Sequence, residues 1–351
     1  MSAPPSISYD LSVVIATYDR PDGLAATLRS CLAQTNALNL SIEIVVIDNH
    51  PTGSGRAVVE SLAGGAMPIR YVADLTRNMS TLRNRGFSEA EGALVAFIDD
   101  DEVAHPDWLD QLVGAVRDTG ADIAVGPRLA IFANGAAPTY DPTGAQFVRD
   151  LHLADRALIE LTGPNGKPRF GLGTGNSLFD VERCFPGRAA AMREEFGDAG
   201  GEDAELLARL HRQGRKIVWA AKAFVTETVA AHRTAPSYRL IRTRRETQHY
   251  VSIYLDGAAR PRLAWAELMT KGLIQLVVGF LWACVTAEFT STRRLRGRLL
   301  MEHGLGKLNW RRSVGYIKEP PSNSRDRGEN TTVTTVVSKK FDRQSILDNR
   351  L

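Results

Sequence analysis

The N-terminal part of the chain alternates short, uniformly apolar runs with segments in which apolar residues recur at helical spacing. The apolar runs predict β-strands and lie at 11–16, 42–47, 69–72, 93–98 and 122–125. Behind Pro21, leucines recur every four residues, which predicts a helix, and further helices are expected at 81–91 and from Pro106 onward. Apolar strands that alternate with helices indicate an α/β fold with a mostly parallel sheet covered on both faces.

The second half of the chain has a different pattern. Residues 130–170 are rich in Gly and Pro and are expected to form an irregular, loop-dominated region, followed by a helix at 202–213 and a last strand at 216–219. From about residue 234, basic helices are expected around an apolar stretch at 272–287. We therefore predict an α/β domain at 1–232, a basic helical region at 233–318 and a disordered tail at 319–351.

Charge is distributed unevenly along the 351 residues. The net charge is +3, but residues 209–318 carry 21 Lys and Arg against 6 Asp and Glu, which leaves 22 basic and 34 acidic residues elsewhere. This asymmetry suggests a metal as partner of the acidic part and an anionic membrane surface as partner of the basic part. No aromatic-interleaved or helix-turn-helix pattern supports a nucleic-acid partner.

Cysteine usage and the N-terminal residues bear on the compartment. Cys31, Cys184 and Cys284 lack metal-site spacing, so we expect buried, reduced thiols in a cytoplasmic protein. The first ten residues contain no apolar run behind a basic flank, so no secretory signal is expected there.

Three adjacent carboxylates, Asp99, Asp100 and Asp101, follow the apolar run at 93–98. Their mutual repulsion must be neutralised, and Mg²⁺ or Mn²⁺ does so with oxygen ligands while it also binds substrate phosphates. In parallel sheets, ligands bind beyond the carboxyl ends of the strands, which is where these residues are expected. The alternative is a solvated acidic turn.

Five segments together carry a family resemblance: 13–21 (VVIATYDRP), 46–49 (VIDN), 83–86 (RNRG), 97–101 (FIDDD) and 200–209 (GGEDAELLAR). In this order and spacing they resemble a family 2 glycosyltransferase of GT-A fold, in particular the bacterial succinoglycan-type transferases that build exopolysaccharide repeat units. The resemblance runs from about residue 11 to residue 245. It implies that 1–232 is a nucleotide-diphospho-sugar transferase domain and the catalytic domain, with a nucleotide-binding part at 11–125 and an acceptor and base part at 126–232. The basic helical C-terminal extension at 233–318 is expected to associate with a membrane.

The resemblance also implies a nucleotide-binding set, which comprises Thr17, Tyr18, Asp48, Arg83 and Asp99. Asp48 would accept a hydrogen bond from the base, commonly a uracil N–H. Asp99 would lie near the ribose and the metal, and Asp101 would hold the metal. The alternatives are a strand-to-turn cap for Asp48 and a surface helix position for Arg83.

The catalytic base implied by the resemblance is Asp203, with Glu202 as its neighbour in the acceptor pocket. Inverting transfer needs a base that takes the proton of the attacking hydroxyl, and the preceding Gly200 and Gly201 would let the acceptor approach. The alternative is a carboxylate that merely stabilises a helix N-terminus. The glycine-rich segment 171–177 is expected beside the donor sugar and acceptor, with Asn176 as the side chain to test.

The chain departs from the family pattern at two places. Where many members have a metal- or diphosphate-binding His, this chain has Glu227, which suits Mg²⁺ or Mn²⁺ or instead pairs with a basic residue such as Arg233. The Q-x-x-R-W signature of processive synthases is also missing, since Gln248 is followed by His-Tyr-Val-Ser. We therefore expect one sugar to be transferred per encounter.

The apolar stretch at 273–287 is 15 residues long, shorter than the about 20 residues that span a bilayer. With basic residues at Lys271 and 293–298, it favours an interfacial helix on the inner face of the plasma membrane, while a buried core helix and a true span stay open. The expected reaction is inverting transfer of one sugar from a nucleotide-diphosphate sugar, expected to be UDP-linked, to a hydroxyl of a lipid-linked saccharide. The alternatives are a sugar-phosphate nucleotidyltransferase and an inactive, membrane-associated assembly subunit.

Overall fold

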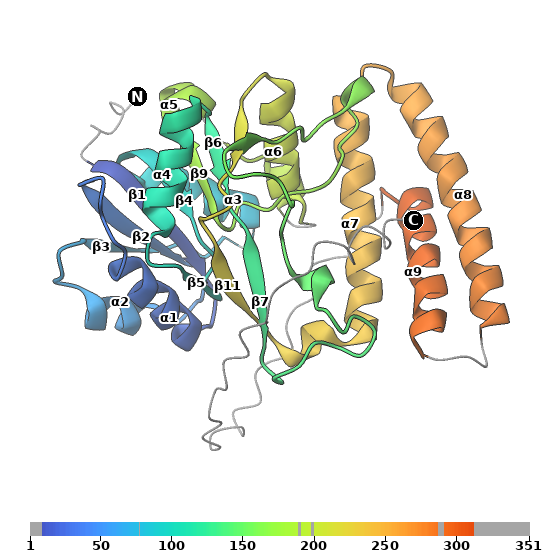
Figure 1. Ribbon diagram of the computed structural model, residues 1–351, viewed down its shortest axis with the longest axis horizontal. Helices are drawn as coiled ribbons and strands as arrows, with labels where there is room; N and C mark the ends of the chain where they lie inside the picture. The colour runs from blue at the N-terminus through green and yellow to red at the C-terminus, as the bar shows by residue number, and fades with distance from the viewer. Residues whose placement is uncertain (1–8, 77, 189–190, 198–199, 287–290, 312–351) are drawn as a thin grey trace. The chain divides into compact units, whose positions relative to one another are not determined.

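The structure is a computed structural model that describes residues 9–76, 78–188, 191–197, 200–286 and 291–311. Its main sheet has eight strands in the order β3-β2-β1-β4-β9-β6-β10-β8 (Figure 1). These are β1 Tyr9–Thr17, β2 Ile42–Asp48, β3 Ile69–Ala73, β4 Gly92–Phe97, β6 Ile123–Val125, β8 Ala157–Leu158, β9 Ser177–Asp180 and β10 Ile217–Trp219. Because β1 pairs in parallel with both β2 and β4, the carboxyl ends of these three strands meet at one edge. The predicted mostly parallel α/β sheet is confirmed.

A second, three-stranded sheet was not predicted as such. It comprises β5 Glu102–Ala104, β11 Val225–Val229 and β7 Arg128–Phe132, in the order β5-β11-β7. The strand expected at 216–219 is therefore not the last one, because β11 follows it. β11 runs antiparallel to β5 and places Glu227 opposite Glu102. Strand β5 begins directly after the acidic triplet 99–101, which follows β4. The second sheet therefore brings β7 and β11, which are distant in sequence, close to the carboxyl end of β4.

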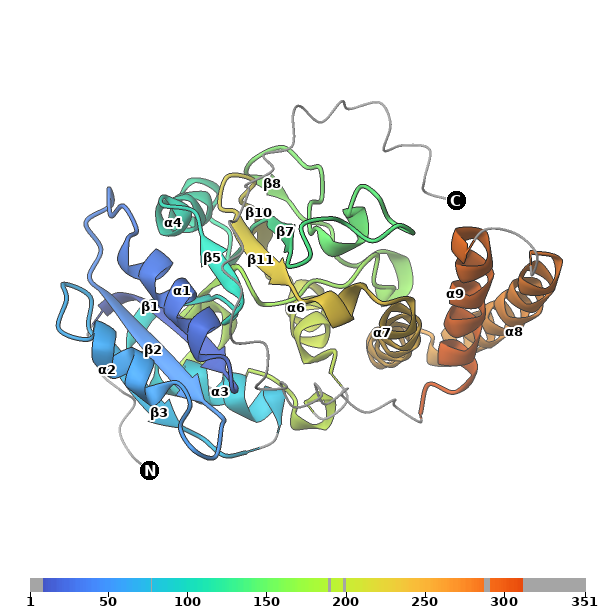
Figure 2. The same ribbon diagram turned by 90° about the horizontal axis from the view of Figure 1, so that it is seen from below.

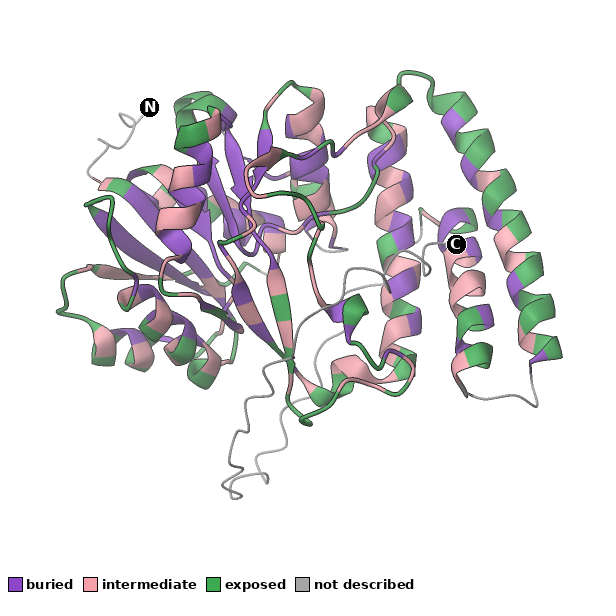
Figure 3. Cartoon of the chain, viewed as in Figure 1, coloured by how far each residue is buried: buried purple, intermediate pink, exposed green. Residues whose placement is uncertain are grey.

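Two apolar cores cover the two faces of the main sheet. In β1, Val13 and Ile15 pack with Leu28 in one core, whereas Val14 packs with Phe87 in the other. This alternation follows from the pleat of the strand, which points successive side chains to opposite faces. Figure 3 shows the resulting buried sheet. The covering helices are α1 Pro21–Leu32, α2 Arg56–Leu62, α3 Met79–Glu89, α4 Trp108–Thr119, α5 Val181–Cys184 and α6 Glu202–Arg212.

The region predicted to be irregular contains little regular structure besides β7 and β8. Short 3-10 turns interrupt it and the segments that follow it: η1 Ala145–Phe147, η2 Pro164–Gly166, η3 Pro186–Arg188, η4 Glu194–Phe196 and η5 Ala231–Thr234. The short strand β9 comes after this region and inserts between β4 and β6, antiparallel to both. It thereby carries the preceding glycine-rich segment to the acidic edge of the sheet.

Three helices form the C-terminal part: α7 Pro236–Gly257, α8 Pro261–Val285 and α9 Ser291–Leu308. Helix α9 packs against both α7 and α8 (Figures 1 and 2). Glycines allow the close approach of α8 and α9, since a Cβ on Gly279 would lie 2.8 Å from the Gly297 carbonyl oxygen and 2.7 Å from the Met301 nitrogen. The predicted basic helices are confirmed. The predicted tail, 319–351, lies outside the described residues.

Most of the surface of α8 is exposed and apolar. Only a narrow line of small or apolar residues is buried: Ala264, Leu268, Gly272 and Gly279. The exposed side chains include Leu273, Ile274, Val277, Val278, Phe280, Leu281 and Trp282. The helix has 25 residues, more than the apolar stretch alone predicts, and is the one helix among the described residues that is long and apolar enough to cross a membrane. Because this helix is mostly exposed, it is not the buried core helix that was one alternative. Cys284 is also exposed, so the prediction of three buried thiols was wrong for this residue.

Candidate active site

The carboxyl edge of β1, β2 and β4 gathers the predicted polar residues. Thr17 ends β1, and its hydroxyl donates a 2.8 Å hydrogen bond to Asp100 Oδ2. Arg20, two residues beyond Tyr18, bridges Asp100 and Asp101 at 3.0 and 2.9 Å. Burial raises the pKa of Asp100, although Arg20 and Thr17 oppose that shift. Asp100 therefore ties the end of β1 to the end of β4, while its neighbours on either side border the site.

Asp48 ends β2 and is fully buried. Its carboxylate accepts hydrogen bonds from the His50 and Gly55 backbone nitrogens at 2.8 and 2.7 Å, and from the Tyr71 hydroxyl at 2.9 Å. It thus caps the turn after β2, which was the alternative to contact with a base. Tyr18 is 51% exposed, and its ring lies edge-to-face with that of His50 at 5.1 Å between centroids. This ring pair offers an exposed aromatic surface beside the capped turn.

Arg83 of α3 brings the two halves of the predicted site together. Its guanidinium contacts Glu202 and lies 2.8 Å from Asp203 Oδ1 and 3.9 Å from Asp99 Oδ1. Asp203 Oδ1 also accepts a 2.8 Å hydrogen bond from the Thr174 hydroxyl. Asp99 follows β4 and Asp203 begins α6, so residues about a hundred positions apart share one cleft. Arg83 is buried there and is not a surface helix residue.

The glycine-rich segment before β9 lines the same cleft. A Cβ on Gly175 would lie 2.5 Å from Asp99 Oδ2, and one on Gly173 would lie 3.5 Å from Asp203 Oδ2. Glycine at 175 therefore permits the close approach of the loop to Asp99. Arg149, which sequence patterns did not single out, holds this loop by donating to the carbonyls of Gly126, Gly173 and Gly175 at 3.1, 3.0 and 2.5 Å.

Asn176 has a different position from the one expected. Its side chain is fully buried and donates to the carbonyls of Pro127 and Ala223 at 2.7 and 2.8 Å. It also accepts a 2.7 Å hydrogen bond from Trp108 Nε1. These contacts take up the amide, so the placement favours a role in holding the loop over contact with an acceptor.

The turn before α6 needs its two glycines. Gly200 and Gly201 have φ angles of +84° and +89°, a left-handed conformation that glycine adopts without strain. A Cβ on Gly201 would also lie 2.6 Å from the His249 ring of α7. The sharp turn and the contact with α7 together set where α6 begins. They therefore position Glu202 and Asp203 in the cleft.

Carboxylates in the cleft are incompletely neutralised. Burial, followed by the charge of Asp203, raises the pKa of Glu202 to about 7. Burial, followed by the charges of Asp99 and Glu227, raises the pKa of Asp101 to about 7. Burial, followed by Asp99, raises the pKa of Glu102 to about 8, and its Oε1 atom is buried without a hydrogen-bond partner in the described part of the chain.

These oxygens fit a hard divalent cation by their chemistry, because Mg²⁺ and Mn²⁺ prefer carboxylate oxygens and a cation would offset the surplus negative charge. Within the described ranges, however, no group of three or more His, Cys, Asp and Glu side chains is arranged to hold a metal ion. Asp101 instead pairs with Arg20 at 2.9 Å and lies 3.5 Å from Arg233. These carboxylates alone therefore do not form a metal site in the described ranges, and a cation held here would need further ligands, such as phosphate oxygens.

Glu227 pairs with basic residues on both of its oxygens. Arg233 lies 2.7 Å from Oε1 and Arg128 lies 3.0 Å from Oε2. This is the arrangement given as the alternative to metal ligation. Glu227 lies beside Asp101, and the charge of Glu227 raises the pKa of Asp101. Both carboxylate oxygens of Glu227 are paired with guanidinium groups.

Comparison with known proteins identifies the family. The model of glycosyl transferase family 2 matches residues 12–195. The chain belongs to this family. It is 31% identical over 266 residues to the succinoglycan biosynthesis protein ExoM of Rhizobium meliloti, which covers 74% of this chain and 80% of that protein. It is 29% identical to the validoxylamine A glucosyltransferase of Streptomyces hygroscopicus subsp. jinggangensis, over 58% of this chain and 52% of that one.

A solved structure supports the fold. A mannosyltransferase from Pyrobaculum calidifontis, in complex with GDP-Man and Mn²⁺, superposes with a TM-score of 0.53 at 15% identity and covers 87% of this chain and 89% of that one. The predicted GT-A fold and the resemblance to succinoglycan-type transferases are confirmed. This family 2 glycosyltransferase is an enzyme of the hexosyltransferase type with relatives in exopolysaccharide synthesis.

Proposed function

We propose that this enzyme transfers one sugar from a nucleotide-diphosphate sugar, UDP-linked, to a hydroxyl of a lipid-linked saccharide with inversion. The observation that carries the proposal is the bridge made by Arg83, which contacts Glu202 and Asp203 and approaches Asp99. A base candidate and the first member of the D-x-D pair therefore share one cleft. A transfer reaction needs this proximity between the acceptor hydroxyl and the donor.

In the proposed complex, the nucleotide lies at the carboxyl edge of β1, β2 and β4. Tyr18 offers an exposed ring for the base, and Arg83 a guanidinium for the diphosphate. Thr17 and Asp48 shape this edge through their contacts with Asp100 and with the turn after β2. Their buried hydrogen bonds support an indirect contribution, through the shape of the nucleotide site.

Asp99 and Asp101 would hold Mg²⁺ or Mn²⁺ together with the donor phosphates, and Glu227 would stay paired with its arginines unless donor binding releases it. When bound, the metal stabilises the charge that develops on the leaving nucleoside diphosphate. To hold the cation, Asp101 Oδ2 would give up its contact with Arg20. The mannosyltransferase complex with Mn²⁺ supports this assignment at the level of the fold.

Asp203 is the proposed base. Its Oδ1 is held by Arg83 and Thr174, and its Oδ2 faces Gly173. Because Gly173 has no side chain, an acceptor hydroxyl can approach Oδ2 and give up its proton there as it attacks the anomeric carbon. Glu202 contacts the same guanidinium group of Arg83 and would fix the orientation of that group in the acceptor pocket.

The acceptor is proposed to lie at a membrane surface. The apolar side chains of α8, such as Phe280 and Trp282, are exposed, and the basic segment 293–298 begins α9. An apolar helix flanked by arginines suits the interface of an anionic bilayer, here the inner face of the plasma membrane. The exposed surface supports interfacial attachment by α8 and α9, with the catalytic domain of 1–232 in the cytoplasm.

The test is a donor screen with the purified chain and Mn²⁺, in which nucleoside diphosphate release is measured. Asp203→Asn should lower the transfer rate at least about 100-fold, because a general base contributes that much or more. Asp118→Asn is the control: it also removes one carboxylate charge, but its side chain is exposed and pairs with Arg156 at 2.7 Å. Transfer by Asp203→Asn at the rate of the control would refute the assignment of the base.

The products separate the alternatives. A nucleotidyltransferase attacks the α-phosphate and would form pyrophosphate instead of a nucleoside diphosphate. An inactive assembly subunit would leave polysaccharide yield normal in a strain that carries Asp203→Asn. The acidic cleft around Arg83 favours the transferase over both.

A further inference from the structure

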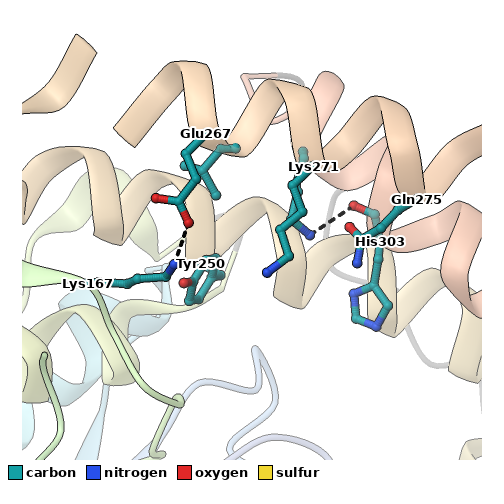
Figure 4. Close-up of a pocket in the computed structure, with 8 residues that line it drawn as sticks. Lys167, Tyr250, Glu267, Lys271, Gln275 and His303 are labelled. Carbon is teal, nitrogen blue, oxygen red and sulfur yellow. Dashed lines mark hydrogen bonds and ion pairs between the residues drawn. The ribbon is translucent and has the colours of Figure 1, made fainter. Parts of the chain in front are cut away.

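A cavity of about 230 Å³ lies between helices α7, α8 and α9, apart from the acidic cleft (Figure 4). Its lining combines basic and polar side chains: Lys167, Tyr250, Glu267, Leu268, Lys271, Gln275, His303 and Lys307. The proposed transfer reaction uses none of them. A ligand that carries negative charge would stabilise three lysines so close together beside an apolar helix.

Lys307 is the most unusual of these residues because its side chain is buried, with only 6% of the residue exposed. Its ammonium group donates a long 3.4 Å hydrogen bond to the His303 carbonyl, and within the described part of the chain no carboxylate forms an ion pair with it. Burial and the charge of Lys271 lower the pKa of Lys307 to about 8. A buried cation beside a second cation is unfavourable without an anion.

The other polar groups leave the cavity positively charged. Lys167 pairs with Glu267 at 2.5 Å, at one end (Figure 4). Burial, together with the charges of Lys307 and Arg239, lowers the pKa of His303 to about 4, so this ring is neutral. With a neutral histidine, three lysines face one glutamate among the residues that line the cavity, a surplus of two positive charges.

Acidic and amide groups nearby do not remove this surplus. Glu246 lines a second cavity that shares His303 and Lys307 with the first. Arg242 lies 2.6 Å and Arg239 3.6 Å from its carboxylate, which these two guanidinium groups neutralise. Gln275 interrupts the apolar sequence of α8, and its Oε1 is buried without a hydrogen-bond partner in the described ranges. An amide can turn to present its N–H groups, so Gln275 can donate to an anion in the cavity.

We propose that this cavity binds the phosphate or diphosphate group of a lipid, with Lys271, Lys307 and Gln275 as its donors. The hydrocarbon chain of that lipid would lie along the exposed apolar side chains of α8, which continue from Lys271 through Ile274 and Val278. The proposal rests on the lipid-linked acceptor of the proposed function. Lysines bind phosphate as point charges, and a diphosphate would match the surplus charge of the lining.

Helix α7 connects this cavity to the turn that carries the proposed base. Tyr250 lines the cavity, and the preceding His249 packs against Gly201 at the start of α6. Lys167 likewise stands four residues before the glycine-rich segment that faces Asp203. A lipid phosphate held here would keep an attached saccharide on the side of α7 and α6 where the acceptor is expected.

The test measures binding of a short-chain, water-soluble prenyl diphosphate to the full chain by calorimetry, without divalent metal, so that the acidic cleft does not compete. The wild type should bind it more tightly than the matching prenyl alcohol. Lys271→Gln and Lys307→Gln should each weaken diphosphate binding about tenfold, the effect of one charge-assisted contact. Arg262→Gln is the matched control, since it removes one exposed positive charge from α8 outside the cavity.

Vesicle flotation then distinguishes the lipid sources. Phosphatidylcholine vesicles are compared with vesicles that also contain phosphatidylglycerol or a polyprenyl diphosphate. A loss by the lysine variants on polyprenyl diphosphate alone identifies the acceptor lipid, and an equal loss on both identifies a phospholipid headgroup. Binding unchanged from that of Arg262→Gln in calorimetry would overturn the proposal. Because Lys271 is exposed, its variant is expected to fold even if the Lys307 variant does not, and neither assay requires sugar transfer.

Discussion

The buried carboxyl group of Glu102 makes the strongest prediction about pH and stability. Glu102 begins β5, has no exposed surface, and accepts a 3.1 Å hydrogen bond from the Asp99 nitrogen through Oε2. Its Oε1 and Asp99 Oδ2 lie 3.3 and 2.5 Å from the position that a Cβ on Gly175 would occupy. In Glu102→Gln, the amide can keep the first bond and direct its N–H groups toward Asp99.

The size of this effect on the free energy of unfolding follows from the pKa of Glu102. Burial, followed by the charge of Asp99, raises the pKa of Glu102 from 4.5 to about 8 in the folded protein, although Arg128 and Arg149 oppose the shift. Between these two values the unfolded chain has lost the proton and the folded chain has kept it. Stability therefore falls as pH rises from about 4.5 to about 8 and is level above that range. At about 1.4 kcal/mol per pKa unit, the whole loss is about 5 kcal/mol.

Glu102→Gln removes this loss. Urea unfolding with EDTA in the buffer should give similar free energies of unfolding for both proteins near pH 5. By pH 8 the variant should be more stable by a few kcal/mol, about 5 kcal/mol at most. Glu60→Gln is a control for a carboxylate on the exposed face of α2. If the wild type and Glu102→Gln show parallel pH profiles between pH 5 and pH 8, the charge cost assigned to Glu102 is wrong.

Three further substitutions test the supports of the cleft and of the helical hairpin. Arg149→Met should lower the free energy of unfolding by about 3 kcal/mol in chemical denaturation, because the carbonyls of Gly126, Gly173 and Gly175 lose their donor. Gly201→Ala should cost about 2 kcal/mol, since it places a Cβ at positive φ against His249, and should lower kcat for sugar transfer by displacing the start of α6. Gly279→Leu should lower Tm, with a cost of about 2 kcal/mol, because its side chain meets the α9 backbone at Met301.

The local patterns predicted the elements that depend on nearby residues. The apolar runs predicted β1, β2, β3, β4 and β6, and the parallel pairing of β1 with its neighbours confirms the meeting of their carboxyl ends. The acidic triplet could be placed at this edge because its position is fixed by the end of β4. Periodicity likewise predicted α1 and α6, whose buried faces are those of the repeating leucines.

Residues whose partners are distant in sequence could not be predicted in this way. β9 pairs antiparallel with β4 across more than seventy residues, and β11 opposes β5 across more than a hundred. Arg149 lies in an irregular segment with no periodicity, yet the Gly126 carbonyl and two carbonyls of the cleft loop accept from it. Arg20 had a signal, because it stands in the polar turn after β1. Asn176 was predicted to contact the acceptor because it lies in the glycine-rich segment. The sequence does not show that its amide is buried.

The arginines account for how a cleft with so many carboxylates folds before a donor binds. Seven acidic residues gather in and beside the cleft: Asp99, Asp100, Asp101, Glu102, Glu202, Asp203 and Glu227. Five arginines face them: Arg20, Arg83, Arg128, Arg149 and Arg233. If all seven were ionised, the cleft would carry a surplus of two negative charges. The raised pKa values of the buried Asp101, Glu102 and Glu202 reduce this surplus by favouring their protonated forms. A divalent cation has two positive charges, as many as this surplus requires. A cation that arrives with the donor phosphates would therefore neutralise the carboxylates that the arginines leave unpaired.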